Sequence, residues 1–143
     1  LRFNFRGVGR SEGSYDEGRG EIEDARAALQ WLRQEYPELP LWLAGFSFGA
    51  RVALALGCQE ELVGRILAVG LPVQDPEREA QVYSGCTREK IFLQSTHDEF
   101  GPKDLLERFV ALLPGPKRLL WVEAADHFFG DALDSLEEAV MRI

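Results

Sequence analysis

Short apolar segments alternate with helical segments along this chain, and that alternation limits the possible folds more than any other feature. The apolar segments, each of a length suited to a buried strand, are Leu1–Phe5, Leu41–Phe46, Arg65–Gly70, Lys90–Ser95 and Arg118–Glu123. The segments expected to be helical are Glu21–Tyr36, Gly49–Cys58, Lys103–Leu113 and Asp131–Ile143. Strands that alternate with helices predict an α/β fold, in which a mostly parallel sheet carries helices on both faces.

The composition fits one domain, residues 1–143, and argues against a nucleic-acid or membrane partner. The chain has 24 acidic and 16 basic residues and a formal charge of −8, whereas nucleic-acid-binding proteins usually show the opposite balance. The best apolar stretch, Leu39–Ala50, is interrupted by Ser47 and falls short of the roughly 18 residues that a membrane-spanning helix needs.

The two cysteines, Cys58 and Cys86, do not have the spacing of a metal site. Disulfides persist in oxidising compartments and concentrate in small secreted domains with many cysteines, and two cysteines do not make such a framework. We therefore expect both side chains to be reduced thiols in a cytoplasmic protein.

The segment Gly45-Phe46-Ser47-Phe48-Gly49 fits the pattern G-x-S-x-G. Composition alone gives about 0.06 chance matches in a chain like this one, so the pattern needs support from its context. It follows an apolar strand and opens a helix, as a nucleophile elbow requires. In such a turn the serine backbone is strained, the residues at both glycine positions must be small, and the Phe48 N–H stabilises an oxyanion. The alternative is an ordinary turn in which Ser47 caps a helix.

A nucleophilic serine needs a base, and the chain has two histidines, His97 and His127. Both follow expected strands, and the carboxyl ends of parallel strands meet at the edge of the sheet where ligands bind. We expect His127, just past the last strand, to be the base. His97 is expected to be a solvent-facing loop residue.

A carboxylate must then orient the imidazole, and the candidates are Asp98, Glu99 and Asp126. The order Ser47, Asp98, His127 matches the order of the catalytic triad in α/β-hydrolases. Asp126 ranks lower because residues adjacent in sequence rarely face each other.

Three motifs together resemble the α/β-hydrolase superfamily. They are the R-G-x-G-x-S-x-G turn at Arg6–Gly13, the G-x-S-x-G segment at Gly45–Gly49, and Asp126–Phe129. Their order and content are similar to a small, capless bacterial subgroup of serine hydrolases related to dienelactone hydrolases. The resemblance covers essentially the whole chain.

The resemblance implies that Ser47 is the nucleophile, His127 the base and Asp98 the orienting acid. It has departures. The acid turn of that subgroup usually reads like G-D-x-D-E, whereas this chain has Ser95–Glu99. Dienelactone hydrolases proper use a cysteine nucleophile where this chain has a serine.

The chain opens at Leu1, inside an expected strand and without an initiator methionine. The resembled fold has eight strands, whereas we expect five. We therefore expect an amino-terminal part to be missing, including the loop that supplies a second oxyanion donor. We also expect the strand Leu41–Phe46 to have a bare apolar edge, and the 143 residues alone to be poorly soluble and nearly inactive.

The sequence leaves two other functional classes open. The glycines of Arg6–Gly13 could belong to a dinucleotide-binding turn, but their spacing is one residue too long and Glu12 stands where the third glycine belongs. The second class is a non-catalytic or binding protein on a hydrolase fold, because a fold does not imply a function.

The aromatic residues near the expected site are Phe46, Phe48, Phe100, Phe128 and Phe129, and each is more often a core residue than a pocket residue. The loop Leu71–Thr87, with at most one helical turn, is too short for a lid. The sequence therefore predicts a serine hydrolase with an open site that cleaves carboxylic esters or thioesters of small or extended substrates through an acyl-enzyme. No metal or cofactor is implied.

Overall fold

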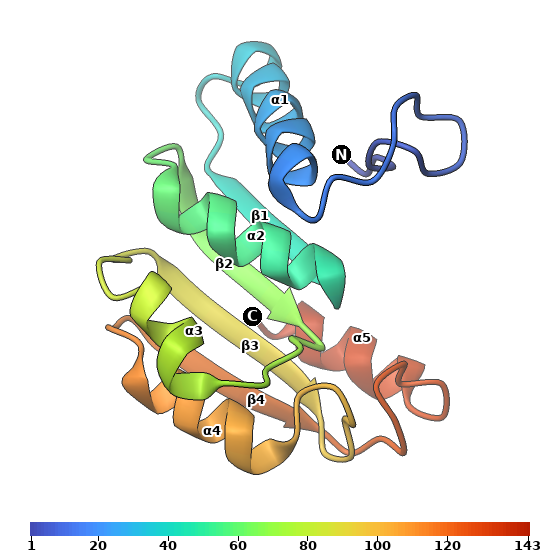
Figure 1. The fold of residues 1–143 in the computed structure, drawn as a ribbon, viewed down its shortest axis with the longest axis vertical. Coiled ribbons are helices and arrows are strands. Elements are labelled where there is room, and N and C mark those ends of the chain that lie inside the picture. The colour runs from blue at the N-terminus through green and yellow to red at the C-terminus, as the bar shows by residue number, and fades with distance from the viewer.

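The computed structural model describes all 143 residues as a four-stranded sheet and five helices (Figure 1). The strands are β1 (Leu41–Phe46), β2 (Val63–Val69), β3 (Glu89–Ser95) and β4 (Lys117–Val122). The helices are α1 (Arg19–Glu35), α2 (Phe48–Gln59), α3 (Pro76–Val82), α4 (Lys103–Leu112) and α5 (Leu133–Met141). The strands lie in the order β1-β2-β3-β4 and each pair is parallel, so the predicted α/β architecture is confirmed.

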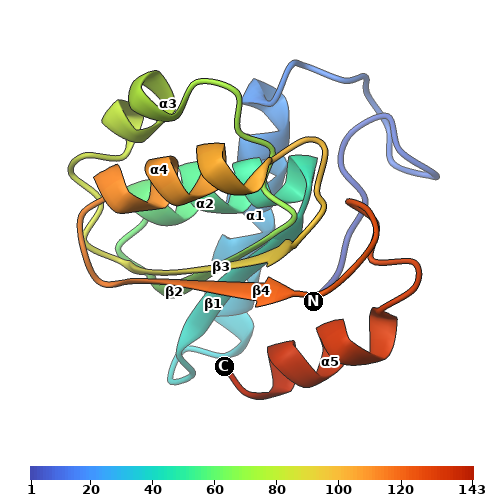
Figure 2. The same cartoon turned by 90° about the horizontal axis from the view of Figure 1, so that it is seen from below.

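The sheet separates two cores because successive side chains of a strand point to opposite faces. Ile66, Ala68 and Phe92 belong to the larger core, which is shared with α2 and α4. Their neighbours Leu67 and Leu93 belong to the smaller core, against which α5 packs. Figure 2 shows α2, α3 and α4 on one side of the sheet and α5 on the other.

One predicted strand is wrong and one helix is longer than expected. The segment Leu1–Phe5 is not a strand, and no backbone hydrogen bond joins it to β1. A strand exists only where a neighbouring strand pairs with its N–H and C=O groups, so an apolar alternation alone cannot create one. The loop Leu71–Thr87 contains α3, a helix of 7 residues, at whose start Asp75 accepts a hydrogen bond from the Arg78 N–H at 3.2 Å.

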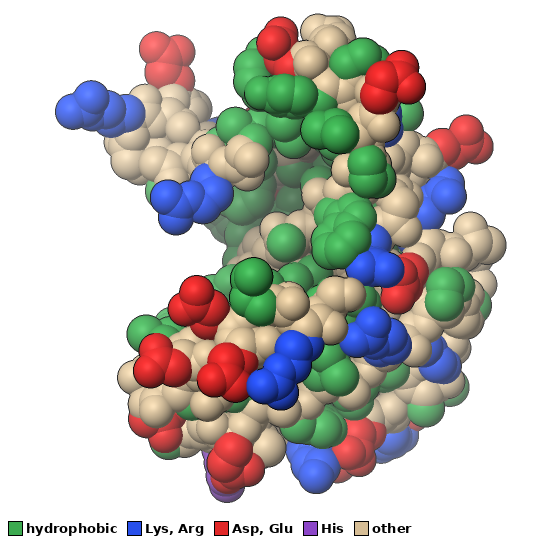
Figure 3. Space-filling model, turned by 180° about the vertical axis from the view of Figure 1, so that it is seen from behind, with side chains coloured by type: hydrophobic (Ala, Val, Ile, Leu, Met, Phe, Trp, Pro, Cys, Tyr) green, Lys and Arg blue, Asp and Glu red, His purple; other side chains and the backbone are tan.

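The strand β1 forms one edge of the sheet and is only partly covered. Trp42 and Phe46 are about half exposed, and the Arg65 guanidinium lies 4.2 Å from the centre of the Trp42 ring. Figure 3 shows a hollow beside the amino-terminal segment, with hydrophobic side chains inside it. None of the five helices is both long enough and apolar enough to cross a membrane.

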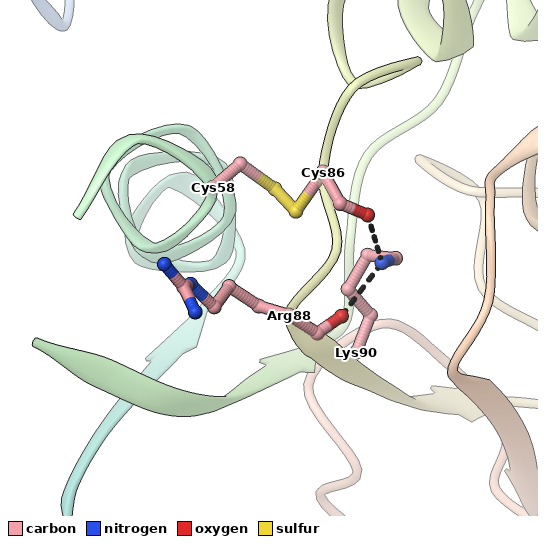
Figure 4. Close-up of a disulfide and its surroundings, with 4 residues drawn as sticks. All are labelled: Cys58, Cys86, Arg88 and Lys90. Carbon is pink, nitrogen blue, oxygen red and sulfur yellow. Dashed lines mark hydrogen bonds between the residues drawn. A yellow bond between two sulfur atoms is a disulfide. The ribbon is translucent and has the colours of Figure 1, made fainter. Parts of the chain in front are cut away.

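The prediction of two reduced thiols is wrong, because Cys58 and Cys86 form a disulfide (Figure 4). Cys58 lies at the end of α2, and Cys86 lies in the segment that leads into β3. The fold brings their Cα atoms to 5.0 Å although 28 positions separate them in the sequence. Beside the disulfide, the fully buried Lys90 donates hydrogen bonds from Nζ to the carbonyl oxygens of Cys86 at 2.9 Å and Arg88 at 2.7 Å.

The glycine-rich segment that precedes α1 is a separate turn and does not open the helix. Gly7, Gly9 and Gly13 all have positive φ angles, and Ser14–Gly18 separate them from α1. A dinucleotide-binding turn places its glycines between a strand and the start of a helix, so this segment does not have that geometry. The Arg6 side chain binds Asp24 of α1 through Nη2 at 2.8 Å, and this contact holds the pKa of the Asp24 carboxyl below its usual value.

Candidate active site

Ser47 lies at the turn between β1 and α2, and its backbone is strained as expected for a nucleophile elbow. It has φ 54° and ψ −115°, a conformation that non-glycine residues rarely adopt. Its N–H donates to the Val69 carbonyl oxygen at 2.9 Å, which anchors the turn to β2. A Cβ at Gly45 would lie 2.0 Å from the Gly49 carbonyl oxygen, so position 45 requires glycine. The expectation that Gly49 must also be small is wrong, because a Cβ there would meet open space.

The structure brings Ser47, His127 and Asp98 together in one chain of hydrogen bonds. The Ser47 Oγ lies 2.9 Å from His127 Nε2, and His127 Nδ1 lies 2.8 Å from Asp98 Oδ2. An ionised carboxylate only accepts hydrogen bonds, so Nδ1 carries the imidazole proton. Nε2 is then free to accept the proton of the Ser47 hydroxyl.

Asp98 is buried, and its carboxylate is held on both oxygens. Oδ1 accepts the backbone N–H of Phe100 at 2.9 Å and that of Gly101 at 3.0 Å. Oδ2 accepts the Gln94 side-chain amide at 2.9 Å in addition to the His127 contact. The acid turn, which departs from the glycine-containing pattern, thus still places a firmly held carboxylate beside the imidazole.

The imidazole of His127 is 2% exposed and is surrounded by phenylalanine rings. The ring centres of Phe46, Phe100 and Phe128 lie 4.9, 4.8 and 5.2 Å from it. These three residues are between 42% and 63% exposed, so the expectation of plain core packing is wrong for them. Phe129 is fully buried and does belong to the core.

The remaining candidate side chains stay outside the hydrogen-bond chain. His97, 65% exposed, faces the Ala124 carbonyl oxygen at 3.0 Å, which confirms it as a solvent-facing loop residue. Asp126 accepts the Phe128 N–H at 2.8 Å and does not reach the imidazole. Glu99 accepts the backbone N–H of His127 at 3.1 Å, a supporting contact that sequence reasoning missed.

The Phe48 N–H is available to a negatively charged oxygen. The hydrogen bonds of α2 begin with the N–H groups of Ala50 and Arg51, which both donate to the Ser47 carbonyl oxygen. The Phe48 N–H therefore has no acceptor within the protein, and it lies at the positive end of the helix dipole.

A cavity of about 590 Å³ lies beside the start of α2. Phe48 and Arg51 of α2 line it, together with Tyr15, Arg78 of α3 and Tyr83. Burial raises the pKa of the Tyr83 phenol. The chain has no cluster of three or more metal-binding side chains.

Gln94 is a further polar residue that the sequence reasoning passed over. It is fully buried and binds Asp98. Its signal in the sequence was a polar amide inside the apolar run of β3.

Known proteins of similar sequence and fold show the family of this chain. A family model described as an alpha/beta hydrolase domain matches residues 2–139. An uncharacterised protein of Rickettsia prowazekii is 33% identical over 147 residues, which cover 98% of this chain and 62% of that protein. The structure of an alpha-beta serine hydrolase homologue from Coxiella burnetii superposes with a TM-score of 0.87 at 34% identity over 99% of this chain.

A lidless serine hydrolase from Xanthomonas campestris has a TM-score of 0.85 and 32% identity over 99% of this chain. The chain spans 66% of the Coxiella structure and 63% of the Xanthomonas structure, so it corresponds to somewhat less than two thirds of these relatives. The family model and these structures match nearly every residue of the chain. The chain thus belongs to the α/β-hydrolase superfamily.

Proposed function

We propose that this protein is a serine hydrolase that cleaves carboxylic esters or thioesters through an acyl-enzyme. The observation that carries the proposal is the hydrogen-bond chain from Ser47 through His127 to Asp98, which starts on a strained turn at the sheet edge. The serine hydrolases among its structural relatives support the same reaction class.

In the proposed reaction, the Ser47 Oγ attacks the acyl carbon while His127 Nε2 takes the hydroxyl proton. Asp98 holds the imidazole in the required tautomer and stabilises the imidazolium that forms. The Phe48 N–H donates to the oxyanion of the tetrahedral intermediate.

The intermediate then collapses, and the leaving alcohol or thiol takes the proton from His127. A water molecule, deprotonated by the same nitrogen, attacks the acyl-enzyme. The second collapse releases the carboxylic acid and returns the proton to Ser47.

The surroundings of the imidazole favour an ester with an apolar group on one side of the scissile bond. The exposed rings of Phe46, Phe100 and Phe128 form an apolar rim at His127. The segment Leu71–Thr87 contributes only the short helix α3, which is too small to be a lid domain over this rim.

A fluorophosphonate probe tests the proposal directly, because it phosphonylates only an activated serine. We expect labelling of the protein at its full length, mapped by peptide mass to Ser47, and none in Ser47→Ala. A panel of p-nitrophenyl esters and acyl thioesters of increasing chain length then defines the substrate. A folded full-length protein that is neither labelled nor able to hydrolyse any ester would instead be a non-catalytic protein on a hydrolase fold.

A further inference from the structure

The Gln94 side chain sits where a polar group is costly to bury. It lies in β3 between the two cores and is 0% exposed. A buried amide without hydrogen-bond partners destabilises a fold, so the loss of any hydrogen bond of the Gln94 amide carries a free-energy cost. One of these bonds reaches the carboxylate that binds His127.

We propose that Gln94 is a positioning residue that orients Asp98 for His127. This inference rests on the proposed hydrolase function, since it assigns a task within the same site. Gln94 Nε2 donates to Asp98 Oδ2 at 2.9 Å, the same oxygen that faces His127 Nδ1 at 2.8 Å. The Gln94 amide thus donates to the same oxygen that accepts the hydrogen bond from His127 Nδ1.

The orientation of the amide is determined by its other partners. Gln94 Oε1 accepts the Leu71 backbone N–H at 2.8 Å, and only the oxygen of the amide can do so. The nitrogen must then face Asp98 and the carbonyl oxygen of Gly101, which is 3.2 Å away. Gln94 therefore links the end of β2, through Leu71, to the acid turn after β3.

The close approach of the acid turn to this amide needs glycine at position 101. A Cβ at Gly101 would lie 2.5 Å from Gln94 Nε2 and 2.3 Å from the Leu71 carbonyl oxygen. The backbone N–H of Gly101 in turn donates to Asp98 Oδ1 at 3.0 Å. One glycine therefore lets the turn contact both the amide and the carboxylate.

Without the amide donor, Asp98 Oδ2 keeps a single partner, His127. Oδ1 stays bound to the N–H groups of Phe100 and Gly101, but Oδ2, the oxygen that accepts the Nδ1 hydrogen bond, is held less firmly. The Nδ1 tautomer of His127 is then less strongly favoured. Because a triad histidine in the wrong tautomer cannot take the serine proton, the expected loss is in kcat and not in KM.

The test compares Gln94→Leu with Gln94→Glu in the full chain, over a range of pH. Gln94→Leu has no donor at any pH, so its kcat should be about 10- to 100-fold below wild type at every pH, a typical loss for a residue that supports a site ligand. In Gln94→Glu the introduced carboxyl can still accept the Leu71 N–H, but it donates to Asp98 only while protonated. The ratio of its kcat to that of wild type should therefore fall as the pH rises.

Two matched controls separate positioning from general destabilisation. Ser95→Ala, on the same strand, removes the hydroxyl that donates to the Ala124 carbonyl oxygen and accepts the His97 N–H, and it leaves every contact of the Asp98 side chain in place. Gly130→Ala adds a methyl group in open space, whereas Gly101→Ala pushes on the Gln94 amide. We expect Gly101→Ala to lower kcat, and both controls to keep it within about 2-fold of wild type.

A readout without catalysis makes the two proposals separable. The ¹H NMR signal of the His127 Nδ1 proton reports its hydrogen bond to Asp98 even in a chain that hydrolyses nothing. We expect this signal to shift or to vanish by exchange in Gln94→Leu and to be retained in Ser95→Ala. A chain without esterase activity that shows this pattern would reject the hydrolase function and keep the positioning role. An unchanged signal in Gln94→Leu, or a pH-independent kcat ratio for Gln94→Glu, would overturn the positioning role.

Discussion

Two long polar side chains of the strand β3 are fully buried, Lys90 near its amino end and Gln94 near its carboxyl end, and they bind different kinds of partner. The Lys90 ammonium binds only the backbone carbonyl oxygens of Cys86 and Arg88. Gln94 binds the Asp98 carboxylate, from which hydrogen bonds continue to His127 and then to Ser47 at the surface.

We infer from this difference that the buried polar group at the amino end of β3 serves stability and the one at the carboxyl end serves the proposed reaction. Both side chains lose water on burial and must recover hydrogen bonds from the protein. At the amino end the partners are backbone groups beside a disulfide, which cannot take up or release protons. At the carboxyl end the partners are side chains that can. We therefore expect changes at the amino end to alter unfolding, and changes at the carboxyl end to alter the rate of hydrolysis.

The largest effect is expected at the surface end of the hydrogen-bond chain. Ser47→Ala removes the proposed nucleophile and should lower kcat for a p-nitrophenyl ester by about 10⁵- to 10⁶-fold, since the members of a triad act as a unit. Thermal unfolding should change little. Equal hydrolysis by wild type and variant would remove Ser47 from the mechanism.

Asp98→Asn should follow, with a loss of about 10⁴-fold, because an amide at this position favours the wrong imidazole tautomer. Steady-state ester hydrolysis measures it. Glu99→Gln and His97→Ala serve as matched controls on the same loop and should cost far less. If Asp126→Asn lowers kcat by about 10⁴-fold and Asp98→Asn does not, the orienting carboxylate is Asp126.

At the amino end, loss of the disulfide should lower the free energy of unfolding. Closing a loop of about 28 residues restricts the unfolded chain enough to stabilise the fold by about 3 to 4 kcal/mol. The double variant Cys58→Ser, Cys86→Ser should show this difference in urea denaturation. Its fluorophosphonate labelling, measured well below the unfolding midpoint, should match wild type; slower labelling would show that the two ends are coupled.

Lys90→Met should lower the free energy of unfolding by an amount that depends on pH. Burial, and then the nearby Lys117, lower the pKa of Lys90 in the folded protein. Between that lowered pKa and the ordinary lysine value the unfolded chain binds more protons, so the stability of the wild type rises with pH in that window. The variant lacks this group, and it leaves two carbonyl oxygens unpaired at about 1 to 3 kcal/mol each.

The destabilisation by Lys90→Met should therefore grow as the pH rises towards the ordinary range of lysine, and urea denaturation at several pH values measures it. Hydrolysis below the unfolding transition should be unaffected. A constant difference between the two proteins across this range would contradict the assigned cause.

The smallest effect concerns the backbone strain at Ser47, between β1 and α2. Ser47→Gly and Ser47→Ala both remove the hydroxyl, but only glycine adopts φ 54° and ψ −115° without strain. After allowing for the greater freedom of glycine in the unfolded chain, we expect Ser47→Gly to be more stable than Ser47→Ala by about 1 kcal/mol. Urea denaturation of the two inactive variants measures the difference directly.

Local patterns in the sequence determined most of the elements. The segment Leu41–Phe46 was predicted with the bounds that β1 has, because an apolar run between Pro40 and the glycine-containing turn leaves little choice. The position of Ser47 between a strand and a helix followed from the same neighbourhood. The order of Ser47, Asp98 and His127 along the chain then pointed to the side chains that the structure brings together.

Only the tertiary structure decided the features that depend on distant neighbours. Leu1–Phe5 has the residues of a strand but no partner, and the Cys58–Cys86 bond depends on where α2 ends relative to β3. The link between Gln94 and Asp98 depends on Gly101 fitting closely against the amide. The reason is physical: periodicity and turn residues act over a few positions, whereas pairing, disulfide geometry and buried hydrogen bonds require two remote segments to meet at fixed distances.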